Sequence, residues 1–88
     1  MPIRVEDVKR RGGSIIEKLE RRIIEFLKAH KDYAYTSEEI RKELGLKSNI
    51  PEKDSFYKVL VMVTLMIMAR EGKIKEVIVE DEMHYYVE

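Results

Sequence analysis

The sequence predicts an α+β domain in which three helices are followed by a β-hairpin. The segments SIIE (residues 14–17) and TSEE (residues 36–39) both have the form of a capping box, which starts a helix. Gly45 and Gly72 stand where the second and third helical patterns end. The runs IKEVIVE and EMHYYVE are β-branched and aromatic and meet at an acidic turn around Asp81, which indicates two paired strands.

The first helix is predicted over residues 14–29. Before it, residues 1–13 end in KRRGG, and we expect Gly12 and Gly13 to break any helix there, which leaves a basic N-terminal arm. Within the helix, apolar residues recur at spacings of three and four and predict one buried stripe. Its members are Ile15, Ile16, Leu19, Ile23, Ile24, Phe26 and Leu27. Residues 14–88 are expected to form a single domain.

A short strand and a second helix are predicted next. Tyr33 and Tyr35 are separated by one residue, which is typical of a strand. Thr36 then caps the helical segment SEEIRKELG. Because Ile40 and Leu44 in this segment are four residues apart, we expect both to face the core.

The third helix contains the most apolar stretch of the chain, VLVMVTLMIMA at residues 59–69. We expect Asp54 or Ser55 to cap this helix after the loop LKSNIPEKD, and Gly72 to end it after Glu71. The stripe expected in the core is Val61, Leu65 and Met68. Another side carries Val59, Met62, Val63 and Met66. Since a helix that is apolar all round is normally buried all round, either the rest of the chain or a second copy is expected to cover this side.

Composition argues against several functions. The chain has no cysteine and only two histidines, His30 and His84, which is too few for a structural zinc site. It has neither a glycine-rich phosphate loop nor an HExxH motif, so we expect no enzyme, no metal and no cofactor. The apolar run is shorter than the roughly 18 residues that cross a bilayer, and no signal peptide is evident. We therefore expect a cytosolic protein without a membrane role. The high content of Lys, Glu and Arg and the absence of Cys are typical of proteins from thermophiles.

The predicted order α-β-α-α-β-β resembles that of the winged-helix family, a helix-turn-helix variant with a β-hairpin wing. AYTSEEIRKELGL is similar to the second-helix segment of winged-helix regulators, and AREGKIKEVIVEDEMHYYV is similar to the end of their third helix and their wing. With the first helix, the resemblance covers residues 14–87. It implies a small transcription regulator of prokaryotic or archaeal type that binds double-stranded DNA as a homodimer.

The resemblance also implies which residues contact DNA, because the family places the N-terminal part of the third helix in the major groove. The residues available there for base readout are Lys53, Ser55, Tyr57 and Lys58. The residues expected on phosphates are Arg41, Lys42 and Lys47. Arg10 and Arg11 in the arm are expected to reach a minor groove or phosphates.

Other features favour a different function. The formal net charge is zero, and residues 73–88 carry two Lys/Arg against five Asp/Glu. Glu80, Asp81 and Glu82 at the wing tip would be repelled by a duplex. The apolar side of the third helix occupies a position where DNA-binding relatives often carry polar residues. Two hypotheses follow: a homodimeric DNA-binding regulator with this apolar side as its dimer interface, or a winged-helix module for protein interaction without a DNA role.

Overall fold

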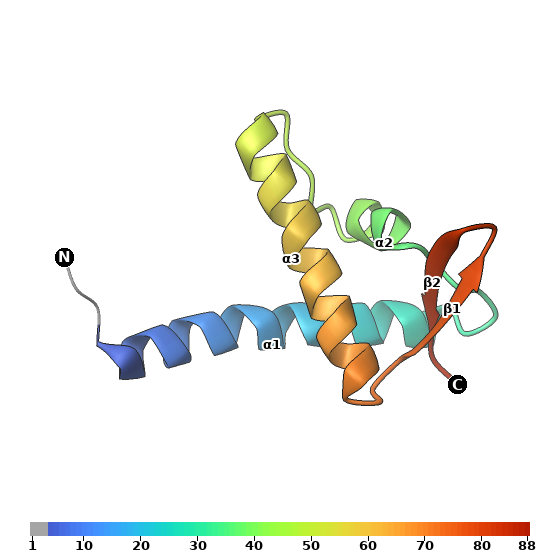
Figure 1. Cartoon of the computed structure of the whole chain (residues 1–88), viewed down its shortest axis with the longest axis horizontal. Helices are drawn as coiled ribbons and strands as arrows, with labels where there is room; N and C mark the ends of the chain where they lie inside the picture. The colour runs from blue at the N-terminus through green and yellow to red at the C-terminus, as the bar shows by residue number, and fades with distance from the viewer. Residues whose placement is uncertain (1–3) are drawn as a thin grey trace.

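The protein has an α+β fold of three helices and a two-stranded antiparallel hairpin (Figure 1). The structure, a computed structural model, describes residues 4–88, and within residues 5–14 it describes the backbone alone. The elements in chain order are α1 (Val5–Ala29), α2 (Ser37–Glu43), α3 (Pro51–Arg70), β1 (Lys75–Val79) and β2 (Glu82–Tyr86). The predicted α+β class is confirmed, and the layout is compatible with the expected winged-helix order.

Helix α1 begins at Val5, so the prediction that Gly12 and Gly13 separate an arm from the helix is wrong, and so is the prediction that the SIIE segment starts the helix. A glycine inside a helix costs only about 1 kcal/mol relative to alanine. Since each residue added to an existing helix gains a hydrogen bond, two glycines do not have to end it. The side chains of Arg10 and Arg11, expected on phosphates, lie outside the described residues.

The hydrophobic core lies between α1, α2, α3 and the end of the hairpin, where α3 crosses α1 (Figure 1). Its buried members are Leu19, Ile23, Leu27, Ile40, Val61, Leu65, Met68, Ile74, Tyr85 and Val87. The predicted core stripe of α3 is therefore confirmed, and so is the middle of the α1 stripe. Ile15 is 54% exposed, so the α1 stripe is buried over a shorter length than predicted.

Helix α2 starts with the predicted capping box. The Thr36 hydroxyl accepts a hydrogen bond from the Glu39 backbone N–H at 3.2 Å, and the Glu39 carboxylate accepts one from the Thr36 N–H at 2.9 Å. After the helix, Gly45 has φ +72°, a conformation that side chains disfavour, and the helix stops there as predicted.

Helix α3 begins at Pro51, earlier than the predicted caps Asp54 and Ser55. Proline suits the first turn of a helix because the N–H that it lacks would have no partner there. Asp54 instead accepts a hydrogen bond from the Ser48 backbone N–H at 3.1 Å, which fixes the preceding loop against the first turn. Gly72, with φ +77°, follows the end of α3 as predicted.

The hairpin closes through a two-residue turn. Val79 pairs with Glu82, and Glu80 and Asp81 between them both have positive φ, as a type I′ turn requires. The predicted strand at residues 33–35 is reduced to one bridge, in which the backbones of Tyr35 and Tyr85 exchange hydrogen bonds of 2.9 and 2.7 Å. The connector after α1 is thereby attached to β2.

Candidate interaction face

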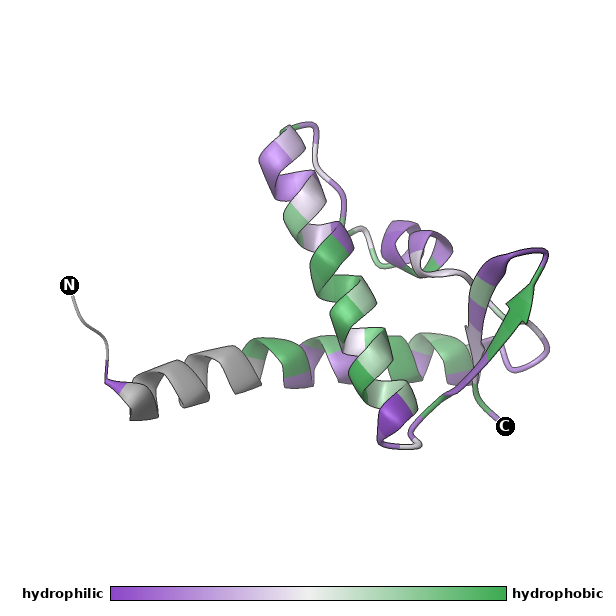
Figure 2. Cartoon of the chain, in the orientation of Figure 1, coloured by the Kyte–Doolittle hydropathy of each residue, from purple (hydrophilic) through white to green (hydrophobic). Residues whose placement is uncertain are grey.

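Helix α3 is apolar on both sides, but the chain covers only one of them. The side opposite the core presents Phe56, Val59, Met62, Val63 and Met66, which are all exposed and which we call the α3 face. Figure 2 shows the hydrophobic colouring continuing along most of α3. The possibility that the rest of the chain buries this side is therefore wrong for the described structure. Because contiguous exposed apolar faces are a common feature of binding sites, the α3 face is the candidate functional site of this structure.

A groove lies beside the α3 face, where α3 approaches the hairpin. Met62 and Met66 from α3 and Met83 and Tyr85 from β2 form its apolar lining. Its polar rim consists of Thr36, Ser37, Glu38 and Glu82, and its volume is about 290 Å³. Methionine side chains are flexible and polarisable, so such a groove adapts to the shape of a partner.

The contribution of Met83 to this groove was missed in the sequence. The available signal was the alternation in β2, because residues 83 and 85 lie on the same side of a strand. The hairpin therefore widens the apolar surface of α3 rather than separating it from solvent.

Arg41 is not a surface residue, although it was predicted to contact phosphate. It is 6% exposed. Its guanidinium donates to the carboxylates of Glu38 and Asp54, both at 2.7 Å, and to the Leu46 carbonyl at 3.3 Å. These contacts connect α2 to the loop and to the first turn of α3, so the prediction that Arg41 binds DNA is wrong for this conformation.

The same network shifts the pKa values of its members. The hydrogen bond from Arg41 lowers the pKa of Glu38. The Ser48 backbone N–H, followed by Arg41, lowers the pKa of Asp54. Hydrogen bonds to the two carboxylates raise the pKa of Arg41. All three groups are charged at neutral pH and hold the α2–α3 connection together.

The four residues predicted to read bases do not share one side of α3. At about 100° per residue, Lys53 and Lys58 point about 140° apart, whereas Ser55 and Lys58 are separated by about 60°. Tyr57 is half-buried. The Lys58 ammonium lies 3.8 Å from the Glu38 carboxylate, so part of its charge is neutralised within the chain.

The remaining predicted phosphate contacts are accessible. Lys42 and Lys47 are exposed near the α2–α3 loop and form no ion pair with the described side chains. The hairpin tip is exposed and acidic, as predicted from Glu80, Asp81 and Glu82. The described surface thus has lysines near one end of α3 and carboxylates at the hairpin tip.

Among the side chains that the structure describes, those of residue 4 and residues 15–88, no cluster of three or more His, Asp or Glu is arranged to hold a metal ion. His30 Nδ1 lies 2.9 Å from the Phe26 carbonyl and His84 Nδ1 lies 3.0 Å from the Glu82 carbonyl, so both rings contact backbone. None of the helices described here is both long and apolar enough to cross a membrane.

No family model matches the chain, and neither a curated protein nor a solved structure does.

Proposed function

We propose that the chain is a protein-interaction module with a winged-helix type of fold, and that the α3 face is its binding surface. The observation that carries this proposal is the exposure of an uncharged, apolar surface on the side of α3 directly opposite the core. In a winged-helix DNA reader this side would meet the major groove, where hydrogen-bonding groups are needed to distinguish bases. Valine and methionine side chains supply none.

The composition of the α3 face suits a protein partner. Phe56 offers an exposed aromatic ring, the type of side chain that anchors interfaces by filling a pocket. Met62 and Met66 join the α3 face to the groove beside the hairpin, which extends the apolar area. Lys58 and Arg70 stand at the two ends of the uncharged run and provide a polar rim.

Site-specific photo-crosslinking in the source cells tests this function. A benzophenone amino acid replaces Phe56 in one variant and Tyr33 in a matched control, since these aromatic side chains are 60% and 65% exposed. We expect a discrete protein adduct from position 56 that is absent from position 33. Equal labelling at the two positions, or no adduct at position 56, would contradict the proposal.

A second candidate function is DNA binding by a homodimeric transcription regulator. The observation that favours it is the group of exposed lysines Lys42, Lys47 and Lys53 around the α2–α3 loop, none of which pairs with a described carboxylate. In helix-turn-helix proteins this region lies close to the phosphates. The acidic hairpin tip and the separated directions of Lys53 and Lys58 count against it.

Gel-shift titration with mixed-sequence duplex at low and moderate salt tests the second candidate. DNA binding predicts an affinity that falls steeply with salt and a smaller salt slope for Lys42→Glu/Lys47→Glu. Glu43→Gln is the control, because it changes a neighbouring charge in the opposite direction. The absence of any shift at low salt would remove DNA from consideration.

A further inference from the structure

We propose that the partner of the α3 face is the α3 face of a second copy, packed antiparallel about a two-fold axis. This inference rests on the proposed function and names the partner of that same surface. It depends on the spacing of six residues along the solvent side of α3 and on the charges at its two ends. These residues are Glu52, Phe56, Val59, Val63, Met66 and Arg70, and all six are exposed.

The spacing is that of a helix–helix seam. Successive members are separated by four, three, four, three and four residues, an average of 3.6, which is one helical turn. Residues at alternating intervals of four and three stay on one side of a helix, and such a side can form the contact line of two helices that cross at about 20°. The side of α3 that faces the core is separate, because Val61, Leu65 and Met68 lie on the opposite side. The seam formed by the six exposed residues is therefore free to contact another helix.

The seam can also pair with the same seam of a second copy that runs in the opposite direction. Read from either end, the intervals four, three, four, three, four are the same. An antiparallel copy centred at the level of residue 61 therefore places Phe56 against the second copy's Met66 and Val59 against the second copy's Val63. Glu52 then faces the second copy's Arg70. A two-fold interface requires such self-complementarity, because the same patch is used twice.

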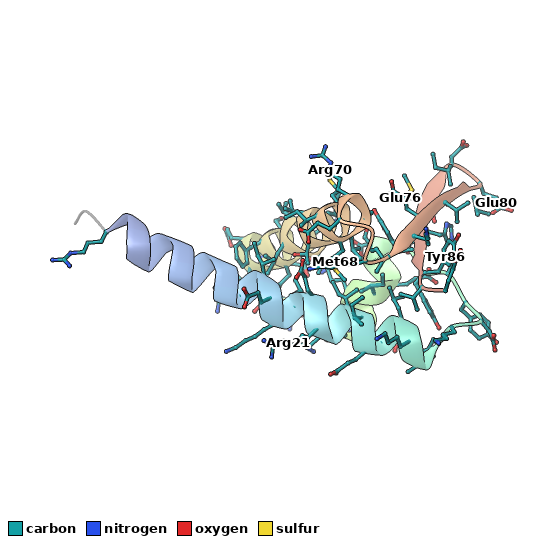
Figure 3. All side chains as sticks on the ribbon, turned by 90° about the horizontal axis from the view of Figure 1, so that it is seen from below. Arg21, Met68, Arg70, Glu76, Glu80 and Tyr86 are labelled. Atoms are coloured by element: carbon teal, nitrogen blue, oxygen red, sulfur yellow. The ribbon has the colours of Figure 1, made fainter. Side chains whose placement is uncertain are left out.

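The end charges select the antiparallel direction. Glu52 and Arg70 are five helical turns apart, roughly 27 Å, and lie on the same side of α3. Neither forms an ion pair with a described side chain, and Figure 3 shows Arg70 pointing away from α1. An antiparallel pair brings each carboxylate to a guanidinium, whereas a parallel pair brings like charges together. Such pairs add little affinity at a surface, but they discriminate between orientations.

Charge reversal measured by sedimentation equilibrium tests the orientation. We expect the wild-type chain to have twice the mass of one copy, and Glu52→Arg and Arg70→Glu each to weaken the dimer roughly tenfold, because two attractive pairs become repulsive. The double variant Glu52→Arg/Arg70→Glu restores the pairs and the wild-type dissociation constant. In a parallel pair, positions 52 and 70 each face the same position of the second copy, so every single variant still has two like-charge contacts. Single variants with the wild-type dissociation constant would therefore overturn the antiparallel arrangement.

Disulfide trapping gives an independent readout, since the chain has no cysteine of its own. We expect mixed Val59→Cys and Val63→Cys chains to oxidise to the heterodisulfide in preference to either homodisulfide. Preferential homodisulfides would overturn the proposed register. If the wild-type chain is monomeric at every concentration while position 56 captures a different protein, self-pairing is overturned and the interaction module remains. A monomer without any adduct overturns both.

Discussion

Two methionines that are two residues apart on α3 provide the sharpest test of the structure. Met68 is 0% exposed in the core, whereas Met66 is 49% exposed on the α3 face. Truncating a buried methionine to alanine costs about 2–5 kcal/mol through lost burial and the cavity that remains. For Met66 only part of the side chain is covered by its own chain, so Met66→Ala is expected to cost about 1 kcal/mol or less.

Guanidinium unfolding followed by far-UV circular dichroism converts this difference into a measurement. With an m-value of about 2 kcal/mol per molar, Met68→Ala should lower the midpoint by about 1.5 M and Met66→Ala by no more than about 0.5 M. The comparison is made at low protein concentration, where any dimer has dissociated. If the two variants shift the midpoint equally, the assignment of opposite sides of α3 to core and surface is refuted.

Three further predictions concern the elements that orient α3. Arg41→Met should reduce the loss of stability between about pH 5 and pH 3, measured as Tm against pH. Folding lowers the pKa values of Glu38 and Asp54, so these two carboxylates stabilise the fold at pH values above the unfolded carboxyl pKa, and this stabilisation is lost as the pH falls through the folded pKa. If Tm depends on pH in the same way in Arg41→Met and in the wild-type chain, this role of Arg41 is contradicted. Thr36→Ala should cost about 1 kcal/mol of unfolding free energy, with Thr36→Ser as the nearly neutral control, and equal losses would exclude capping. Gly72→Ala should lower stability by about 1 kcal/mol because φ is +77° and no atom crowds an added Cβ, and an unaltered Tm would contradict the left-handed turn.

Local signals in the sequence predicted the parts of the fold that depend on near neighbours. The Thr36 capping box and the Gly72 stop involve residues within a few positions of one another, and both are confirmed. The three-and-four spacing of Val61, Leu65 and Met68 likewise required no knowledge of distant contacts. The two β-rich runs predicted the hairpin together with its turn.

The features that the sequence did not predict depend on contacts between elements. In the sequence, Arg41 does not differ from the exposed basic residues around it. In the structure, the α2–α3 loop brings the carboxylate of Asp54, thirteen residues later, to 2.7 Å from the Arg41 guanidinium. Asp54 is not the cap that was predicted, because α3 already begins at Pro51. Gly12 and Gly13 show the limit of a local rule, since the helix continues through both.

The bridge between Tyr35 and Tyr85 has a consequence for the order of folding. It joins positions fifty residues apart, and Tyr85 and Val87 both belong to the buried core. Loop closure over such a separation carries an entropic cost that is recovered only when the distant contacts form. During synthesis on a ribosome, α1, α2 and α3 therefore emerge before their core is complete. Until the hairpin has left the exit tunnel, the core side of α3 lacks Ile74, Tyr85 and Val87, so its apolar surface is more exposed during synthesis than in the folded chain.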